Sequence, residues 1–187
     1  QTALDVLLLP DADTRGVVTV APGTYAHRNA VSTIQVTRKI LLKSDSGPVQ
    51  TILDGALRGL VLNVNHPDAL VAGFGITRGI TTEIGGFSLY AGTLTNCVVF
   101  NNGNAYYAGG VLNNGTITHC AFTQNKTADG GHGGGGRGGL LMINGTLQHS
   151  WITNNTDVTC VGGLEVRGGS VRDCLIANNI QTRNGNN

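Results

Sequence analysis

Short apolar runs separated by glycine and asparagine recur through the second half of the chain. Within each run, apolar residues alternate with polar ones, which is the pattern of a β-strand with one buried face. Between residues 85 and 179 the same phrase occurs four times, each copy opening with Gly-Gly and closing with Asn. A repeat of this kind is typical of a solenoid, in which each coil buries its apolar side chains against the next coil.

The asparagine that closes each copy gives the length of one coil. Successive asparagines are 23, 30 and 24 residues apart, and the longest step contains a glycine-rich insertion at residues 130–136. In coils stacked about 4.8 Å apart, equivalent side chains lie above one another, so inward apolar columns and an amide ladder are expected. The expected ladder consists of Asn102, Asn125, Asn155 and Asn179. The expected inward columns consist of Leu94, Ile117, Leu147 and Val171, and of Val99, Phe122, Ile152 and Ile176.

The sequence therefore predicts one all-β domain, a right-handed parallel β-helix of about seven coils. The coils are expected over residues 17–179. Because the first coil has no neighbour to cover its edge, residues 1–16 are predicted to form an N-terminal cap. Residues 180–187 are predicted to form a polar tail that is too short to cap the other end well.

Composition excludes several classes of protein. The 187 residues carry a formal net charge of +1 and only 12% charged residues, which argues against a nucleic-acid binder and against a charged disordered segment. The 29 glycines fall mostly at repeating positions, so they are interpreted as bends. No apolar run is long enough for a transmembrane segment. No signal peptide is visible, and Gln1 suggests a processed or trimmed start.

The cysteines follow the repeat. Cys97, Cys120 and Cys174 occupy the same inward position in three copies, with Ser150 in the remaining copy, so they are predicted to be small core residues. Stacked cysteines come close to one another, but side chains in register point the same way, which is a poor geometry for a disulfide. Cys160 lies in a bend. No cysteine spacing resembles a zinc site, and neither a metal nor a cofactor is predicted.

Two polar groups are candidates for catalysis or metal binding. Residues Asn96, His119, His149 and Asp173 share one outward column, in which a two-histidine metal site competes with a solvated ladder. The second candidate is the insertion together with its two flanking residues, a segment that contains Asp129, His132 and Arg137 and could carry out acid-base chemistry. A tolerated, flexible loop is the favoured interpretation of this glycine-rich insertion, because a few additional residues at a bend cost little closure entropy. Asp11 and Asp13 are further candidates, as calcium ligands.

The strand after each Gly-Gly is expected to present an apolar stripe on the outside. The predicted interaction stripe consists of Tyr90, Leu112, Leu141 and Ile143. A contiguous stripe of this kind suggests a surface that another chain or a further segment covers. Two other outward residues, Glu165 and Arg167, lie on one strand and are expected to pair with each other or with solvent. No column of carboxylates appears at these positions.

Several motifs resemble those of a known superfamily. The segments Val-Ala-Pro-Gly-Thr-Tyr (20–25), Thr-Ile-Leu-Asp-Gly (51–55) and Gly-Phe-Gly-Ile-Thr-Arg-Gly (73–79) are similar to the pectate-lyase-type right-handed parallel β-helix superfamily. The later copies resemble the repeats of chlamydial polymorphic outer membrane proteins and related bacterial surface proteins. Their Phe-x-x-Asn mark is matched in full at residues 122–125, whereas the other copies replace the Phe by Val99, Ile152 and Ile176. The resemblance covers nearly the whole chain and implies the fold, but the superfamily contains both enzymes and adhesins.

These residues suggest three hypotheses for the function of the protein. The first is a non-enzymatic structural or adhesive module at the cell surface or outside the cell, which associates with itself, laterally or end to end, or binds polysaccharide or other surface material. The alternative is a polysaccharide-acting lyase, hydrolase or epimerase, or a fragment of one. The third is an ice-binding solenoid, which requires a regular threonine array. Thr95 and Thr118 begin such a column, but Gln148 and Arg172 interrupt it.

Overall fold

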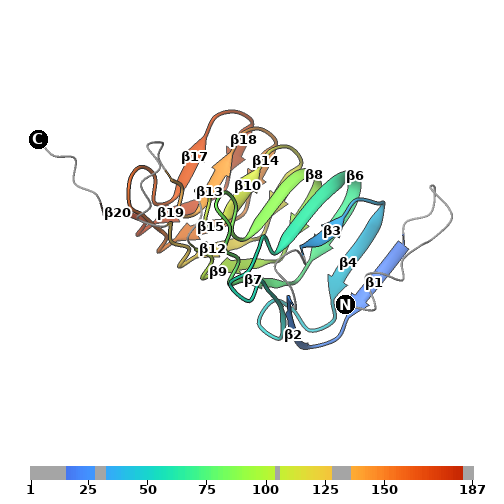
Figure 1. Cartoon of the computed structure of the whole chain (residues 1–187). Helices are drawn as coiled ribbons and strands as arrows, with labels where there is room; N and C mark the ends of the chain where they lie inside the picture. Colours follow the sequence, from blue (N-terminus) through green and yellow to red (C-terminus); the bar gives the residue numbers. More distant parts are fainter. Residues whose placement is uncertain (1–15, 28–32, 104–105, 128–135, 183–187) are drawn as a thin grey trace, which may run out of the picture.

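The computed structural model describes residues 16–27, 33–103, 106–127 and 136–182. Within these ranges the regular structure consists entirely of β-strands, and their pairings are all parallel. The strands wind into a parallel β-solenoid (Figure 1), as the repeat predicts. Six successive turns each contribute a strand to every face, compared with the seven expected. Nearly all of the predicted cap and most of the predicted tail lie outside the described residues.

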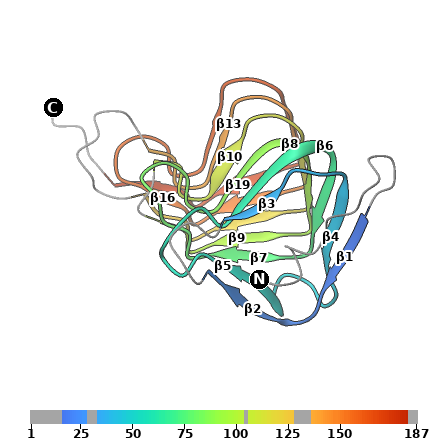
Figure 2. The same cartoon turned by 45° about the vertical axis from the view of Figure 1, so that its right-hand side comes forward.

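The solenoid has three faces, which are seen around the coils in Figure 2. The first face contains β3 (Ile34–Val36), the first parts of β6 (Leu62–Ala72) and β8 (Phe87–Thr95), β10 (Gly110–Leu112), β13 (Leu140–Met142) and β17 (Leu164–Val166). The second contains β1 (Gly16–Val20), β4 (Ile40–Ser44), the last parts of β6 and β8, β11 (Thr116–Thr118), β14 (Thr146–Gln148) and β18 (Ser170–Arg172).

The third face is a separate seven-stranded sheet. It contains β2 (Gly23–Ala26), β5 (Thr51–Asp54), β7 (Gly75–Thr77), β9 (Val98–Phe100), β12 (Ala121–Thr123), β15 (Trp151–Thr153) and β19 (Leu175–Ala177). The short strands β16 (Thr156–Asp157) and β20 (Ile180–Gln181) pair beside it. Each face therefore stacks one short strand per turn, which is why the sequence shows three short apolar runs in each copy.

The core is built from inward columns in strict register. Ile117 pairs with Leu94 on one side and with Leu147 on the other, and Phe122 likewise lies between Val99 and Ile152. All six of these side chains have 0% exposure. On the last described turn the same columns end in Val171 and Ile176, which are 37% and 48% exposed because no described coil lies above them. Both predicted columns are thus present.

The corner between the first and second faces is a column of glycines. Gly92, Gly115, Gly145 and Gly169 all have positive φ angles, between 91° and 104°. A Cβ atom on Gly115 would lie 2.4 Å from the carbonyl oxygen of Gly92. Glycine is needed here for two reasons, because L-residues rarely adopt this conformation and because successive backbones touch at the corner.

A second glycine column corrects the alignment of the repeats. Gly86, Gly109, Gly139 and Gly163 stack on one another, and a Cβ atom on Gly109 would lie only 1.8 Å from the carbonyl oxygen of Gly139. The second copy therefore begins at Ala108-Gly109, one residue earlier than the Gly-Gly motif suggests. Because side chains alternate along a strand, this slip of one residue reverses the direction predicted for Leu112.

Candidate functional site

The four asparagines of the predicted ladder form one file at the corner after the third face. In each pair the side-chain amide nitrogen donates a hydrogen bond to the Oδ1 atom of the next asparagine. The nitrogen–oxygen distance is 3.0 Å in all three pairs. The same Oδ1 atoms accept backbone N–H groups, as Asn125 Oδ1 does from Asn102. Asn102, Asn125 and Asn155 are buried. The amides satisfy buried backbone groups of neighbouring coils, so the ladder has a structural role.

The histidine column lies at the corner between the second and third faces. The His119 and His149 rings stack with their centroids 5.1 Å apart, and His149 Nδ1 lies 3.8 Å from Asp173 Oδ2. All four residues of the column, including Asn96, have φ angles between 47° and 53°. Asn, Asp and His are the non-glycine residues most often found in this left-handed conformation. The left-handed backbone of the corner therefore explains why Asn, His and Asp occupy this column. The side chains of His149 and Asp173 are exposed.

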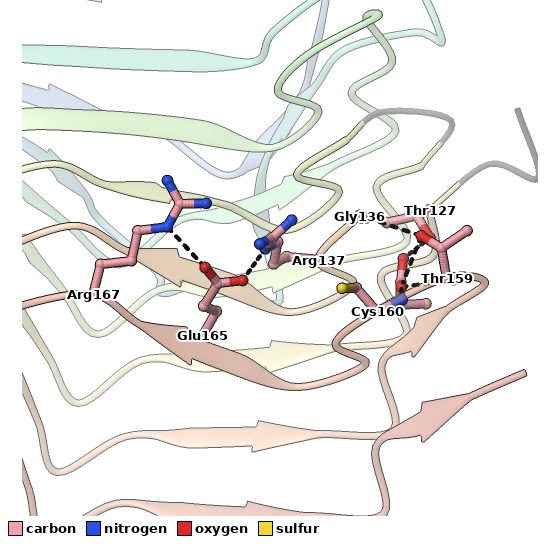
Figure 3. Close-up of polar contacts among 8 residues, drawn as sticks. Thr127, Gly136, Arg137, Thr159, Cys160, Glu165 and Arg167 are labelled. Atoms are coloured by element: carbon pink, nitrogen blue, oxygen red, sulfur yellow. Dashed lines mark hydrogen bonds and ion pairs between the residues drawn. The ribbon is translucent and has the colours of Figure 1, made fainter. Parts of the chain in front are cut away.

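Arg137, the last member of the proposed acid-base loop, is engaged in an ion pair. Its guanidinium binds the Glu165 carboxylate, which also accepts a hydrogen bond of 2.7 Å from Arg167 (Figure 3). The hydrogen bond from Arg137, together with Arg167, lowers the pKa of the Glu165 carboxyl. Arg137 also lies 6.0 Å from the centre of the Tyr107 ring. The expected pairing of Glu165 with Arg167 is confirmed, whereas Asp129 and His132 lie outside the described residues.

A buried carboxylate that the sequence reasoning missed holds the base of the insertion. Asp157 has 0% exposure and accepts hydrogen bonds from Thr127 and from the backbone amides of Thr159 and Cys160. Gly136 in turn donates its N–H to the Thr159 hydroxyl (Figure 3). Thr127 and Gly136, which border residues 128–135, are therefore both tied to one turn. The sequence signal for this turn is the segment Asp-Val-Thr-Cys at residues 157–160. An Asp side chain often accepts hydrogen bonds from the backbone amides two and three residues ahead.

The column of small inward residues is present as predicted. Cys97, Cys120 and Ser150 are buried, Cys174 is half-buried, and all four cysteines are free. The Cys97 thiol donates a hydrogen bond to the backbone carbonyl of Thr95, and the Cys120 thiol donates one to that of Thr118. Burial raises the pKa of the Cys120 thiol. These thiols act as small core residues.

The predicted interaction stripe is wrong for two of its four members. Leu112 is 0% exposed because it points inward, in the column of Leu89 and Met142. Leu141 points outward but is only 1% exposed, and its neighbour Val111 is also buried. Tyr90 and Ile143 remain exposed, at 45% and 36%. The first face therefore presents no continuous apolar stripe.

The exposed apolar surface lies instead on the outer side of the third face. Trp151 and Leu175 are each 53% exposed there, and Trp151 belongs to an interior strand of the sheet. We call this surface the Trp151 patch, and its eight residues contain no charged side chain. The patch consists of Val98, Phe100, Ala121, Thr123, Trp151, Thr153, Leu175 and Ala177. The sequence signal is the uncharged residue that precedes each of Val99, Phe122, Ile152 and Ile176.

An ion pair and a buried histidine lie at the opposite end of the same sheet. The Arg78 guanidinium binds both oxygens of Asp54, at 2.8 and 2.5 Å. Burial of the carboxyl tends to raise its pKa, but the hydrogen bonds from Arg78 and the Ala56 amide outweigh this effect, so the Asp54 pKa is lowered. His27 is 7% exposed, and neither ring nitrogen makes a well-formed hydrogen bond to any described residue. Burial lowers the His27 pKa, although the Val61 backbone and Asp54 oppose the shift.

Acidification is expected to reduce stability through His27. In the unfolded chain His27 takes up a proton as pH falls below about 6.5, whereas in the folded protein it does so only at lower pH. The unfolded state therefore binds more protons in this window, and stability falls with decreasing pH by at most about 1.4 kcal/mol per pH unit. Urea unfolding at a series of pH values would measure the slope. His27→Phe should flatten it, whereas Val49→Ala, at an exposed position without a titratable group, should leave it unchanged.

The chain is not assigned to any known family. No protein-family model, curated protein or solved structure matches the chain. No cluster of three or more His, Cys, Asp or Glu side chains suited to a metal ion occurs within the described ranges. The same residues include no helix with the length and apolar character needed to cross a membrane. Asp11 and Asp13, the candidate calcium ligands, lie outside the described residues.

Proposed function

We propose that the protein is a non-catalytic adhesive module that acts at the cell surface or outside the cell. The observation that carries this proposal is the Trp151 patch, an uncharged and partly apolar surface on a sheet held by in-register coils. Aromatic side chains such as tryptophan are enriched at protein interaction sites relative to the rest of the surface. The resemblance of the repeats to those of bacterial surface proteins supports the same assignment, and the solenoid places the patch on a scaffold that needs no ordering when it binds.

The candidate residues for catalysis have other roles in the described part of the chain. The histidine column occupies left-handed corner positions, and Arg137 is bound to Glu165. Asp54 and Asp157 are the buried carboxylates, and they accept hydrogen bonds from Arg78 and from a turn, respectively. These contacts favour the adhesive module over the polysaccharide-acting enzyme.

Binding assays with Trp151 variants test the proposal. The protein would be incubated with insoluble cellulose, chitin, peptidoglycan and a phenyl resin, and its self-association followed by sedimentation velocity. We expect binding to at least one partner, and about tenfold weaker binding for Trp151→Lys because the charge must be desolvated in the contact. Tyr90→Ala, which truncates an exposed aromatic residue elsewhere, is the matched control.

Two outcomes would contradict the proposal. The first is a strict monomer that binds none of these materials. The second is the appearance of new reducing ends or unsaturated products when the protein is incubated with polysaccharides, which would establish the enzymatic alternative. Equal loss of binding in Trp151→Lys and Tyr90→Ala would show that the patch is not the adhesive surface.

A further inference from the structure

We propose that the Trp151 patch binds a chain of neutral polysaccharide, with Trp151 and Phe100 as stacking platforms for sugar rings. The inference rests on the proposed function and names the chemical class of its partner. Its support comes from the arrangement of aromatic and hydroxyl groups on the patch, from its lack of charge, and from its size.

The aromatic groups lie on adjacent outward columns of the sheet. Trp151 follows Ala121 and precedes Leu175 in one column, so a small side chain on one side leaves the indole uncovered. Phe100 belongs to the neighbouring column, two coils away. A Cβ atom on Gly75 would meet Phe100 Cε1 at 3.3 Å, which places the phenyl ring over the outer surface of that glycine. Both rings are thus on the outside of the sheet.

The separation of the two residues along the solenoid fits an extended sugar chain. Two coil steps separate Phe100 from Trp151, or about 10 Å along the solenoid, which is comparable to the length of a disaccharide unit. Thr123 and Thr153 belong to the Phe100 column. Thr123 lies on the coil between the two aromatic residues, and Thr153 lies on the same strand as Trp151. The C–H faces of sugar rings pack on aromatic rings, and sugar hydroxyls exchange hydrogen bonds with threonine, which both donates and accepts.

Charge and size decide between this partner and others. The patch carries no group that would pair with a uronate or a phosphate, so a neutral polymer fits it better than an acidic one. The four strands from β9 to β19 offer about 200 Å² of outward surface, whereas a stable protein dimer buries about 800 Å² on each partner. A second copy of the protein therefore finds too little area on this patch, but a narrow polymer chain can lie along it.

Tryptophan fluorescence tests the proposal directly, because Trp151 is the only tryptophan in the chain. The full chain would be titrated with soluble hydroxyethyl cellulose and glycol chitin as neutral polymers and with polygalacturonate as the acidic one. We expect a saturable blue shift of the emission with at least one neutral polymer and none with polygalacturonate. Phe100→Ala should raise the dissociation constant at least fivefold, and Tyr90→Ala should change it less than twofold.

The results separate this inference from the adhesive function itself. Binding to peptidoglycan, resin or a second copy that depends on Trp151, without a response to either neutral polymer, would overturn the inference and leave the adhesive function in place. An equal response to polygalacturonate, or unchanged affinity in Phe100→Ala, would also overturn it. If Phe100→Ala does not fold, Thr153→Lys provides the second variant, since it adds a charge beside Trp151 on the outer surface.

Discussion

Replacing Asn125 with alanine is expected to destabilise the protein by about 3 to 5 kcal/mol, because buried backbone groups lose their partners. Asn125 has 0% exposure and lies in the middle of the ladder. Its Oδ1 atom accepts from the backbone amide of Asn102, and its Nδ2 atom donates to the carbonyl of Val99. Both groups are buried, so alanine leaves each of them without its side-chain partner. Urea unfolding followed by circular dichroism gives the change in the free energy of unfolding.

The neighbouring residue provides the control for this variant. Gln124 precedes Asn125 at the same corner and is exposed, with a φ angle of 57°. Gln124→Ala keeps a Cβ atom in the same backbone conformation and should change stability by no more than about 0.5 kcal/mol. A loss of similar size in both variants would mean that the corner conformation, and not the amide ladder, determines the stability of this region.

Gly109→Ala is expected to cost more than about 4 kcal/mol or to prevent folding. The added Cβ atom would lie 1.8 Å from the carbonyl oxygen of Gly139 and 2.9 Å from its carbonyl carbon. A backbone oxygen in a stacked coil cannot rotate away as a flexible side chain can, so the two coils would have to separate. The loss of the amide hydrogen bond from Gly109 to Gly138 would follow. Soluble yield and the thermal unfolding midpoint measure the effect.

Gly103→Ala is the matched control for this steric argument. The nearest atom to a Cβ on Gly103 is the carbonyl oxygen of Lys126 at 3.1 Å, a contact that a small shift relieves. Its expected cost is about 1 kcal/mol or less. If Gly109→Ala were as stable as Gly103→Ala, the close stacking of Gly86, Gly109 and Gly139 would be wrong.

Repetition is what made much of the fold predictable. A phrase that recurs at nearly constant spacing places like residues above one another, so the asparagine ladder, the two apolar columns and the inward cysteines followed from counting alone. The same reasoning aligned His119 with His149, whose rings stack at 5.1 Å. It could not reveal that their corner has a left-handed backbone, although the mixture of Asn, His and Asp in one column is the signal for it.

The candidate surface was much harder to predict. Alternation along a strand has a period of two, so assigning Gly109-Gly110 instead of Ala108-Gly109 to the start of the second copy reversed Leu112 from inward to outward. Leu141 was assigned to the correct side and is nevertheless buried. Exposure of an outward residue depends on what packs over it, and that information does not lie in the strand itself.

The stacking of the chain in parallel coils and the residues that line the core follow from local pattern, because each coil repeats the same alternation of apolar and polar positions. Which outer face remains open depends on packing between the coils. Trp151 is exposed and Leu141 is buried although both point outward. Asp157 and Thr159 likewise hold Thr127 and Gly136, which border residues 128–135, only once the coils are stacked. These features depend on the particular side chains that meet across the coils, which the repeating pattern of apolar and polar positions does not specify.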